Sequence, residues 1–185
     1  MYQFVGKDER NQLVQFCNQV LLDVQKLVKG YFTFEFRLIG SGEKRLITRN
    51  GQNGYYDLDF NLILHKDKQN LGSNPERIKS IFLQAFHDVN PNYGFQSANN
   101  STSVITSKMI LDSKLVFSMD VAILFEGNNG NYYKLIFDKN TNRYLWNEIP
   151  KSRDHFVKFK NIKEAGHWSR FQQRYLELKN YHLSR

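Results

Sequence analysis

Two aspartates, Asp57 and Asp59, alternate within the otherwise apolar segment YYDLDFNLIL, residues 55–64. On a β-strand, side chains two residues apart point to the same face, about 7 Å apart along the backbone. Two carboxylates this close repel each other and are costly to remove from water without a partner. A divalent cation relieves both problems, and Mg²⁺ prefers carboxylate, phosphate and water oxygens. The pair therefore predicts a metal site, on a strand that Leu58 anchors in the core from its opposite face.

A Gly-Ser pair precedes these aspartates. Gly40 follows a strand-like segment and permits a tight turn, which would leave backbone N–H groups and the Ser41 hydroxyl free to bind phosphate if a helix begins there. Lys44, Arg45 and Arg49 add positive charge close by, which suits a triphosphate. Without the aspartates, an ordinary turn and helix cap would be the better interpretation. The expected nucleotide-binding residues are Gly40, Ser41, Lys44 and Arg45.

A third carboxylate is needed for two-metal phosphoryl transfer, near the attacking hydroxyl whose proton it can accept. Asp120 is the best candidate, because it lies alone in the strand-like segment FSMDVAIL. Asp112 lies in the turn-like segment LDSK, and Asp138 ends a strand of an expected hairpin. A carboxylate satisfied by a neighbouring arginine is the alternative interpretation of Asp120. The expected catalytic residues and metal ligands are Asp57, Asp59 and Asp120.

In this order, the motifs resemble the nucleotidyltransferase superfamily with the DNA polymerase β-like catalytic core, in a minimal form. The pattern of that family is a hydrophobic residue followed by Gly-Ser, a spacer, two aspartates that alternate with hydrophobic residues, and later a lone carboxylate between hydrophobic residues. The resemblance covers about half of the chain, residues 32–126. The matching segments are Ile39-Gly40-Ser41, Asp57-Leu58-Asp59-Phe60 and Met119-Asp120-Val121.

The resemblance implies an enzyme that transfers a nucleoside monophosphate from an NTP to an acceptor hydroxyl and releases pyrophosphate. It implies that Asp57 and Asp59 bind two Mg²⁺ ions, or Mn²⁺ in their place, and that Asp120 binds one of them and helps to activate the acceptor hydroxyl. It also implies that Gly40 and Ser41 hold the phosphates of the nucleotide. The acceptor stays open among a nucleic-acid end, a nucleotide, a protein side chain and a small molecule.

Hydrophobic periodicity predicts an α+β fold with a mixed, twisted β-sheet flanked by helices, a C-terminal hairpin and a closing helix. Residues 1–150 are expected to form the catalytic domain, and residues 151–185 a basic helical extension packed on it. The expected helices are 8–29, one from a capping signature at 73–76 to residue 89, and one from about 161 with Gly166 as a weak point. The expected strands are 31–39, 55–64, 101–110 and 114–125, with the hairpin at 131–149 turning at 139–142.

The composition, with 41% hydrophobic residues in 185, suffices for one globular core. No apolar run approaches the roughly 20 residues of a membrane span, so we expect no membrane partner. The single cysteine, Cys17, excludes an internal disulfide framework and is expected in the core. These features predict a cytoplasmic protein.

The net charge of +8 comes mostly from residues 127–185, which contain twelve lysines and arginines but only five aspartates and glutamates. A basic third suggests contact with polyanions, although a solvated basic surface explains it at least as well. Aromatic residues among these lysines could stack on bases, but core packing is the better interpretation; they are Trp146, Phe156, Phe159 and Trp168.

Two functions compete with the enzyme. One is a non-catalytic nucleotide- or RNA-binding module that uses the basic third as its working surface. The intact aspartate set disfavours this module, because three converging carboxylates repel phosphate unless a metal is present. The other is a partner in a toxin–antitoxin or defence pair, which nothing in the sequence tests.

Overall fold

The computed structural model describes residues 1–150 and 153–183. Most of its strands form a seven-stranded mixed sheet in the order β2-β4-β7-β6-β5, and β8 extends it by pairing with both β7 and β9. The strands of this sheet are β2 (Phe32–Ile39), β4 (Tyr56–Asp67), β5 (Asn99–Asn100), β6 (Ile105–Leu111), β7 (Lys114–Glu126), β8 (Tyr132–Asp138) and β9 (Arg143–Ile149). A small second sheet pairs β1 (Tyr2–Phe4) with β3 (Thr48–Asn50).

The helices of the described residues are α1 (Lys7–Val28), α2 (Gly40–Lys44), α3 (Pro75–Val89), α4 (Arg153–Glu164) and α5 (Trp168–Leu183). Short 3-10 turns span Leu71–Ser73 and Asn90–Tyr93. The predicted class, a mixed twisted sheet flanked by helices, is confirmed. No helix among the described residues combines the length and the apolar character that crossing a membrane requires.

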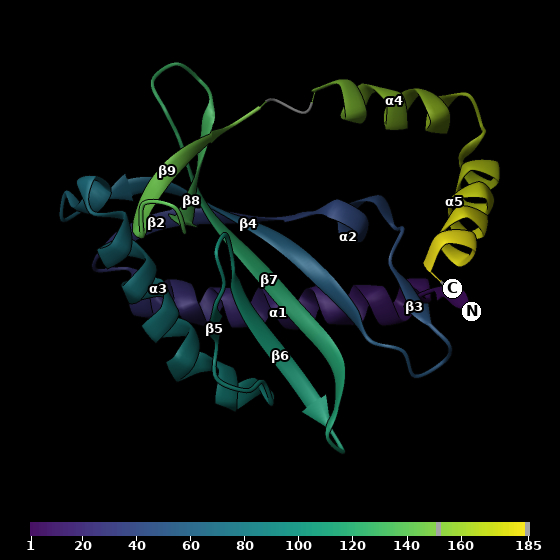
Figure 1. Ribbon diagram of the computed structural model, residues 1–185, viewed down its shortest axis with the longest axis horizontal. Helices are drawn as coiled ribbons and strands as arrows, with labels where there is room; N and C mark the ends of the chain where they lie inside the picture. Colours follow the sequence, from purple (N-terminus) through teal and green to yellow (C-terminus); the bar gives the residue numbers. More distant parts are fainter. Residues whose placement is uncertain (151–152, 184–185) are drawn as a thin grey trace.

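The long helices α1 and α3 cover one face of the sheet (Figure 1). Each carries apolar residues at helical spacing on its inner face, as the sequence predicts. Phe82 of α3 is fully buried; it stacks on Phe32 of β2 with ring centroids 5.4 Å apart, and it meets Phe34 edge-to-face at 5.6 Å. Cys17 of α1 is buried in the same core, also as predicted.

Helix α3 begins where the capping signature predicts. Pro75 occupies the first turn, and the side chain of Asn74 accepts a hydrogen bond of 3.0 Å from the Arg77 backbone N–H. This side chain satisfies one of the backbone donors that a helix N-terminus leaves without a partner. The helix forms part of the long connection from β4 to its parallel neighbour β7, because parallel strands cannot be joined by a tight turn.

The two faces of the central strands differ in character. In β4 the side chains of Leu58, Phe60 and Leu62 are at most 1% exposed and pack toward α1 and α3. Because side chains alternate along a strand, Asp57 and Asp59 point to the other face. Neighbouring β7 follows the same alternation, with Met119 and Val121 in the core. Burial of the apolar face therefore fixes the face on which the carboxylates stand.

The C-terminal region corrects one prediction. In place of a single closing helix from about residue 161, the structure has two helices, α4 and α5. The break lies at Gly166, whose φ of +72° belongs to the left-handed region that glycine adopts without strain. The expected extension begins at residues 151 and 152, which lie outside the described residues.

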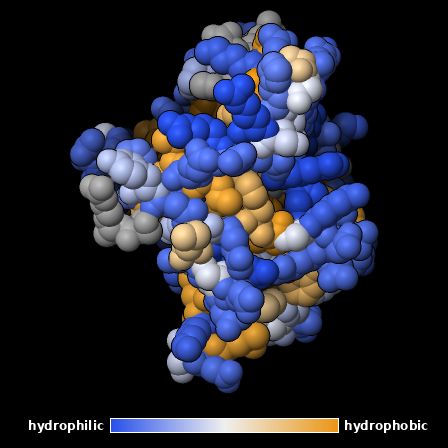
Figure 2. Space-filling model, turned by 90° about the vertical axis from the view of Figure 1, so that its right-hand side faces the viewer, coloured by the Kyte–Doolittle hydropathy of each residue, from blue (hydrophilic) through white to orange (hydrophobic). Residues whose placement is uncertain are grey.

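Helix α5 lies beside the N-terminus of the chain, where it contacts β1 (Figure 1). Tyr2 of β1 and Asn180 of α5 exchange hydrogen bonds, because the Tyr2 N–H donates to the Asn180 side chain and the Asn180 amide donates to the Tyr2 carbonyl. Phe4 stacks on Tyr175. Seen from this end, most of the surface is hydrophilic, with a small hydrophobic group at its centre (Figure 2).

Three of the four aromatic residues singled out in the C-terminal third, Trp146, Phe159 and Trp168, pack against other aromatic side chains. Phe159, Trp168 and Phe171 contact one another across α4 and α5, with ring centroids 5.3 to 6.2 Å apart. Trp146 lies in β9, where it packs on Phe125 and donates a hydrogen bond to a backbone carbonyl. These contacts support core packing, rather than base stacking, as the role of Trp146, Phe159 and Trp168. The Phe156 side chain lies outside the described residues.

Two strands differ from expectation. The segment predicted as a strand from residue 101 pairs as β6 only from Ile105. The Thr48–Asn50 strand lies within the spacer between the Gly-Ser pair and the aspartates and pairs with the N-terminal β1. Short strands of this kind have no alternation long enough to detect from sequence.

Replacing Phe82 by alanine tests the core between α3 and β2. We expect Phe82→Ala to lower the free energy of unfolding by about 3–5 kcal/mol, because it leaves a cavity among buried aromatic rings. The Leu22 side chain of α1 is 40% exposed, so Leu22→Ala should lower the free energy of unfolding by less than about 1 kcal/mol. Urea unfolding with unchanged m-values measures both. Equal losses in the two variants would contradict this description of the core.

Candidate functional site

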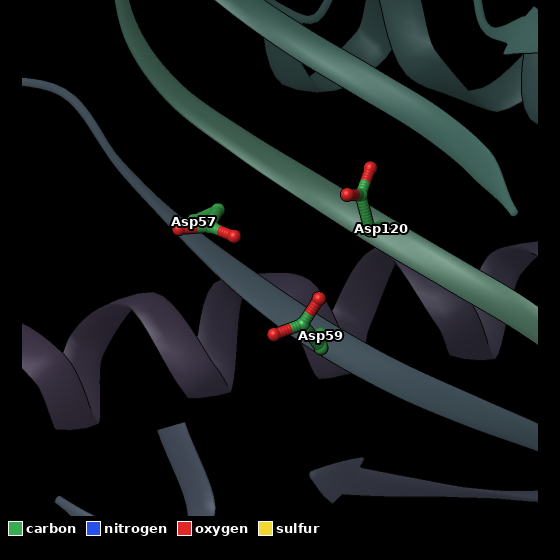
Figure 3. A group of neighbouring side chains, drawn as sticks. All are labelled: Asp57, Asp59 and Asp120. Carbon is green, nitrogen blue, oxygen red and sulfur yellow. The ribbon is translucent and has the colours of Figure 1, made fainter. Parts of the chain in front are cut away.

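The three predicted aspartates meet on the face of the sheet opposite α1 and α3. Strands β4 and β7 pair in parallel with Asp59 directly beside Asp120, and Asp57 lies two residues before Asp59 on the same strand. One carboxylate oxygen from each residue lies within 4.8 Å of the other two. All three side chains rise from the same side of their strands (Figure 3). The predicted convergence of Asp57, Asp59 and Asp120 is therefore confirmed as geometry.

The electrostatics of this group favour a bound cation. Burial, followed by the charges of Asp57 and Asp120, raises the pKa of Asp59 to about 6. Burial, followed by the charge of Asp120, raises the pKa of Asp57 as well. Both shifts mean that the negative charge of the ionised carboxylates is only partly compensated by the surrounding protein. A divalent metal would supply it, and half-buried oxygens of this spacing fit such an ion.

Gly40 brings the Gly-Ser segment against the carboxylates. Its φ is +63°, and a Cβ atom built on it would lie 2.9 Å from Oδ2 of Asp59. Ile39, the residue before it, pairs with Asp59 in the β2–β4 ladder. Helix α2 begins at Gly40, which meets the condition set for phosphate binding in the sequence analysis, and Ser41 lies in its first turn. Only glycine satisfies both the backbone conformation and the close approach.

The position of α2 is fixed from two sides. Gly42 is buried, and a Cβ atom there would lie 2.8 Å from Leu58 and 2.9 Å from Leu38. The guanidinium of Arg10, from α1, donates two hydrogen bonds to the Gly42 carbonyl, at 2.8 and 2.6 Å. The segment beside Asp59 is therefore part of the rigid core rather than a free loop.

The predicted basic residues have different surroundings. Lys44 places its ammonium 5.2 Å from the centre of the Phe159 ring of α4. Arg45 ends α2 in the left-handed conformation, and its carbonyl accepts a hydrogen bond from Gln172 of α5. A role of either in nucleotide binding stays a prediction. Arg49 is paired with Glu9 at 2.8 Å, so the expectation that its charge serves the phosphates is not supported.

Two lysines that the sequence did not point to lie beside the carboxylates. The charges of Asp59 and Asp120 act on Lys134 of β8, whose pKa is nevertheless lowered by burial. The charge of Asp57 acts on Lys179 of α5, whose pKa is also lowered by burial. The ammonium of Lys179 lies 5.1 Å from the Tyr2 ring. Both lysines are isolated in sequence, and only strand pairing and helix packing bring them here.

A cavity of about 740 Å³ lies on the same face of the sheet, and none of the three aspartates lines it. Asn61 lines it two residues beyond Asp59, and Leu124 lines it from β7. Its other walls come from β2, α2, β8 and α4 through residues such as Arg37, Glu43, Tyr132 and Val157. An apolar cavity with a few polar groups is the usual form of a small-molecule site.

Solved structures with the same fold include two bacterial synthases. The Vibrio cholerae DncV cyclic AMP-GMP synthase, in complex with the linear intermediate 5′ pppA(3′,5′)pG, has a TM-score of 0.61 and 13% sequence identity over 86% of this chain. The STING-associated CdnE c-di-GMP synthase from Capnocytophaga granulosa has a TM-score of 0.59 and 14% identity over 89% of this chain. The chain has a polymerase β-like nucleotidyltransferase fold.

A third structure with this nucleotidyltransferase fold is the Bradyrhizobium diazoefficiens CD-NTase CdnG in complex with GTP. It has a TM-score of 0.56 and 15% identity over 77% of this chain. The chain spans 40% of CdnG, 50% of CdnE and 57% of DncV, or about half the length of these proteins. No protein-family model and no curated protein sequence matches the chain.

The raised pKa of Asp59 predicts how stability depends on pH when metal is absent. Between its ordinary value of 3.8 and about 6, the folded state binds more protons than the unfolded state. The free energy of unfolding should therefore fall as the pH rises through this window. In EDTA at pH 8, Asp59→Asn should be more stable than the native protein by about 1 kcal/mol, allowing for solvent screening at a half-buried site.

Thermal unfolding at pH 4 and pH 8 measures this difference, which should vanish at the lower pH. Asp88→Asn, which removes an exposed carboxylate of α3 outside the site, is the matched control and should gain nothing. A native protein that is as stable at pH 8 as Asp59→Asn would show that these carboxylates are not under strain.

Proposed function

We propose that this chain is a metal-dependent nucleotidyltransferase that transfers a nucleoside monophosphate from an NTP to an acceptor hydroxyl. The observation that carries the proposal is the group of three carboxylates, whose oxygens lie within 4.8 Å of one another on two parallel strands. The fold supports it, because the similar structures are polymerase β-like nucleotidyltransferases.

In this proposal, Asp57, Asp59 and Asp120 would together hold two Mg²⁺ ions, with Mn²⁺ as an alternative. The bound ions would neutralise the phosphates and stabilise the charge that develops on the attacking and leaving oxygens. Asp120 would accept the proton of the acceptor hydroxyl. The chain itself mainly positions the reactants, which is the largest contribution that a protein makes to phosphoryl transfer.

The Gly40-Ser41 segment is proposed to hold the phosphates of the NTP. Its support is the close approach of Gly40 to Asp59, which would place phosphate oxygens next to the metal ligands. Lys44 and Arg45 would add charge from the end of the same short helix. The 740 Å³ cavity lies on the same face and is large enough for the nucleoside.

The donor is proposed to be an NTP, because CdnG holds GTP in its solved structure. A nucleotide is the acceptor best supported among the open classes, because DncV holds a linear dinucleotide triphosphate. A nucleic-acid end, a protein side chain and a small molecule remain the alternatives. A non-catalytic binding module is disfavoured by the three carboxylates, and a defence partner is distinguished by co-purification of a second protein.

Calorimetric titration of the four NTPs, with and without Mg²⁺, tests the site. We expect binding of at least one NTP to require Mg²⁺ and to weaken tenfold or more in Asp57→Asn, because that variant removes a shared metal ligand. Asp88→Asn is the control and should bind as the native protein does. Chromatography of the reaction mixtures should then show pyrophosphate and a nucleotide product with the same metal requirement.

Binding that ignores both Mg²⁺ and Asp57 would contradict the proposed site. Strong salt dependence together with that result would favour a binding module instead, because phosphate contacts made by basic side chains weaken steeply as salt is added.

A further inference from the structure

The hydroxyl of Thr106 contacts one of the three carboxylates directly. Oγ1 of Thr106 donates a hydrogen bond of 2.6 Å to Oδ1 of Asp120. The two residues stand directly opposite each other where β6 pairs with β7. Thr106 therefore rises from the same face of the sheet as the carboxylates, from the strand next to β7.

The residues on either side of Thr106 hold it in place. Ile105 is fully buried in the core. Ser107 is also fully buried, and its hydroxyl and the Asn90 side chain exchange hydrogen bonds of 3.0 and 3.1 Å. Because neighbouring side chains on a strand point to opposite faces, these contacts direct Thr106 toward Asp120. A β-branched side chain also has few rotamers to choose from, so the hydroxyl is fixed in direction.

The other two carboxylates lack such a contact. Within the described part of the chain, neither Asp57 nor Asp59 accepts a hydrogen bond from another side chain. Asp120 differs because one of its oxygens is already bound to a rigid donor. A hydroxyl donates a single proton, so Oδ2 of Asp120 keeps its full capacity to bind a cation or accept a proton.

We propose that Thr106 is a positioning residue that fixes the orientation of the Asp120 carboxylate. This inference rests on the proposed function. Asp120 is the carboxylate with two tasks, metal binding and acceptance of the hydroxyl proton, and both require an oxygen held in one direction. Groups that hold a metal ligand in this way commonly change metal affinity or activity by 10- to 100-fold when they are removed.

Binding of Mn²⁺, measured by electron paramagnetic resonance in the protein without nucleotide, tests the proposal. Thr106→Val keeps the shape of the side chain and removes its hydroxyl, and should weaken Mn²⁺ binding about tenfold. Thr106→Ser restores the hydroxyl and should recover most of that affinity. Thr141→Val is the matched control, because Thr141 donates a similar hydrogen bond of 2.8 Å to Asp138 in the β8–β9 turn. It should bind Mn²⁺ as the native protein does.

The outcomes separate this proposal from the proposed function. Native protein that binds Mn²⁺, together with Thr106→Val that binds it equally well, would overturn the role of Thr106 and leave the metal site standing. Equal losses in Thr106→Val and Thr106→Ser would also overturn it, because the hydroxyl would then not be the cause. If the native protein binds Mn²⁺ no better than Asp57→Asn does, the result would overturn the metal site and this inference with it.

A kinetic measurement adds a second test in the same variants. If pyrophosphate release is detected, Thr106→Val at saturating Mg²⁺ should lower kcat and leave the KM for NTP nearly unchanged, because the metal sites are then filled and the remaining task of Asp120 is to accept the proton of the acceptor hydroxyl. A rise in KM with kcat unchanged would contradict the assignment.

Discussion

Repulsion between three carboxylates is the interaction on which the rest of this structure depends. The parallel register of β4 and β7 places Asp59 beside Asp120, and two residues of strand separate Asp57 from Asp59. Left to themselves, these charges would separate or take up protons, as the raised pKa of Asp59 shows. They stay together because the other face of the same strands is closed by buried side chains such as Leu58. Core burial thus holds a group of charges that local electrostatics opposes.

Several elements of the fold contribute residues to the surroundings of the carboxylates. Gly40 lets β2 and α2 approach Asp59 without a side chain in between. Lys134 of β8 and Lys179 of α5 bring partial charge compensation from opposite ends of the group. Thr106 of β6 contributes a single hydrogen bond, donated by its uncharged hydroxyl. These elements come from almost the whole length of the chain, and each contributes one or two side chains. The site is therefore a product of tertiary structure, although its central residues belong to short local motifs.

The difference between local motifs and tertiary contacts explains what the sequence could predict. Asp57 and Asp59 share a face through the two-residue period of a strand, and Asp120 is the lone charge in an apolar run. All three site residues could therefore be predicted from the sequence. The sequence could not predict that Lys134, Lys179 and Thr106 lie near them, because only the register of β6 and β8 and the packing of α5 give these residues their positions. Gly166 indicated a weak point where α4 and α5 separate, but glycine also occurs within helices, so the sequence alone did not predict a break there. The pairing of Arg49 with Glu9 was not predictable either, because the two residues are forty positions apart.

The exchange of hydrogen bonds between Tyr2 and Asn180 joins residues 178 positions apart. Contacts of such long sequence separation form late in folding, because the chain must first close a very large loop. During synthesis, β4 and β7 would leave the ribosome and could pair well before α5 exists. The flank of Asp57 beside Lys179 would thus be completed only after β4 and β7 have been made. Nascent chains would pass through a stage at which the carboxylates are already gathered but still open on that side.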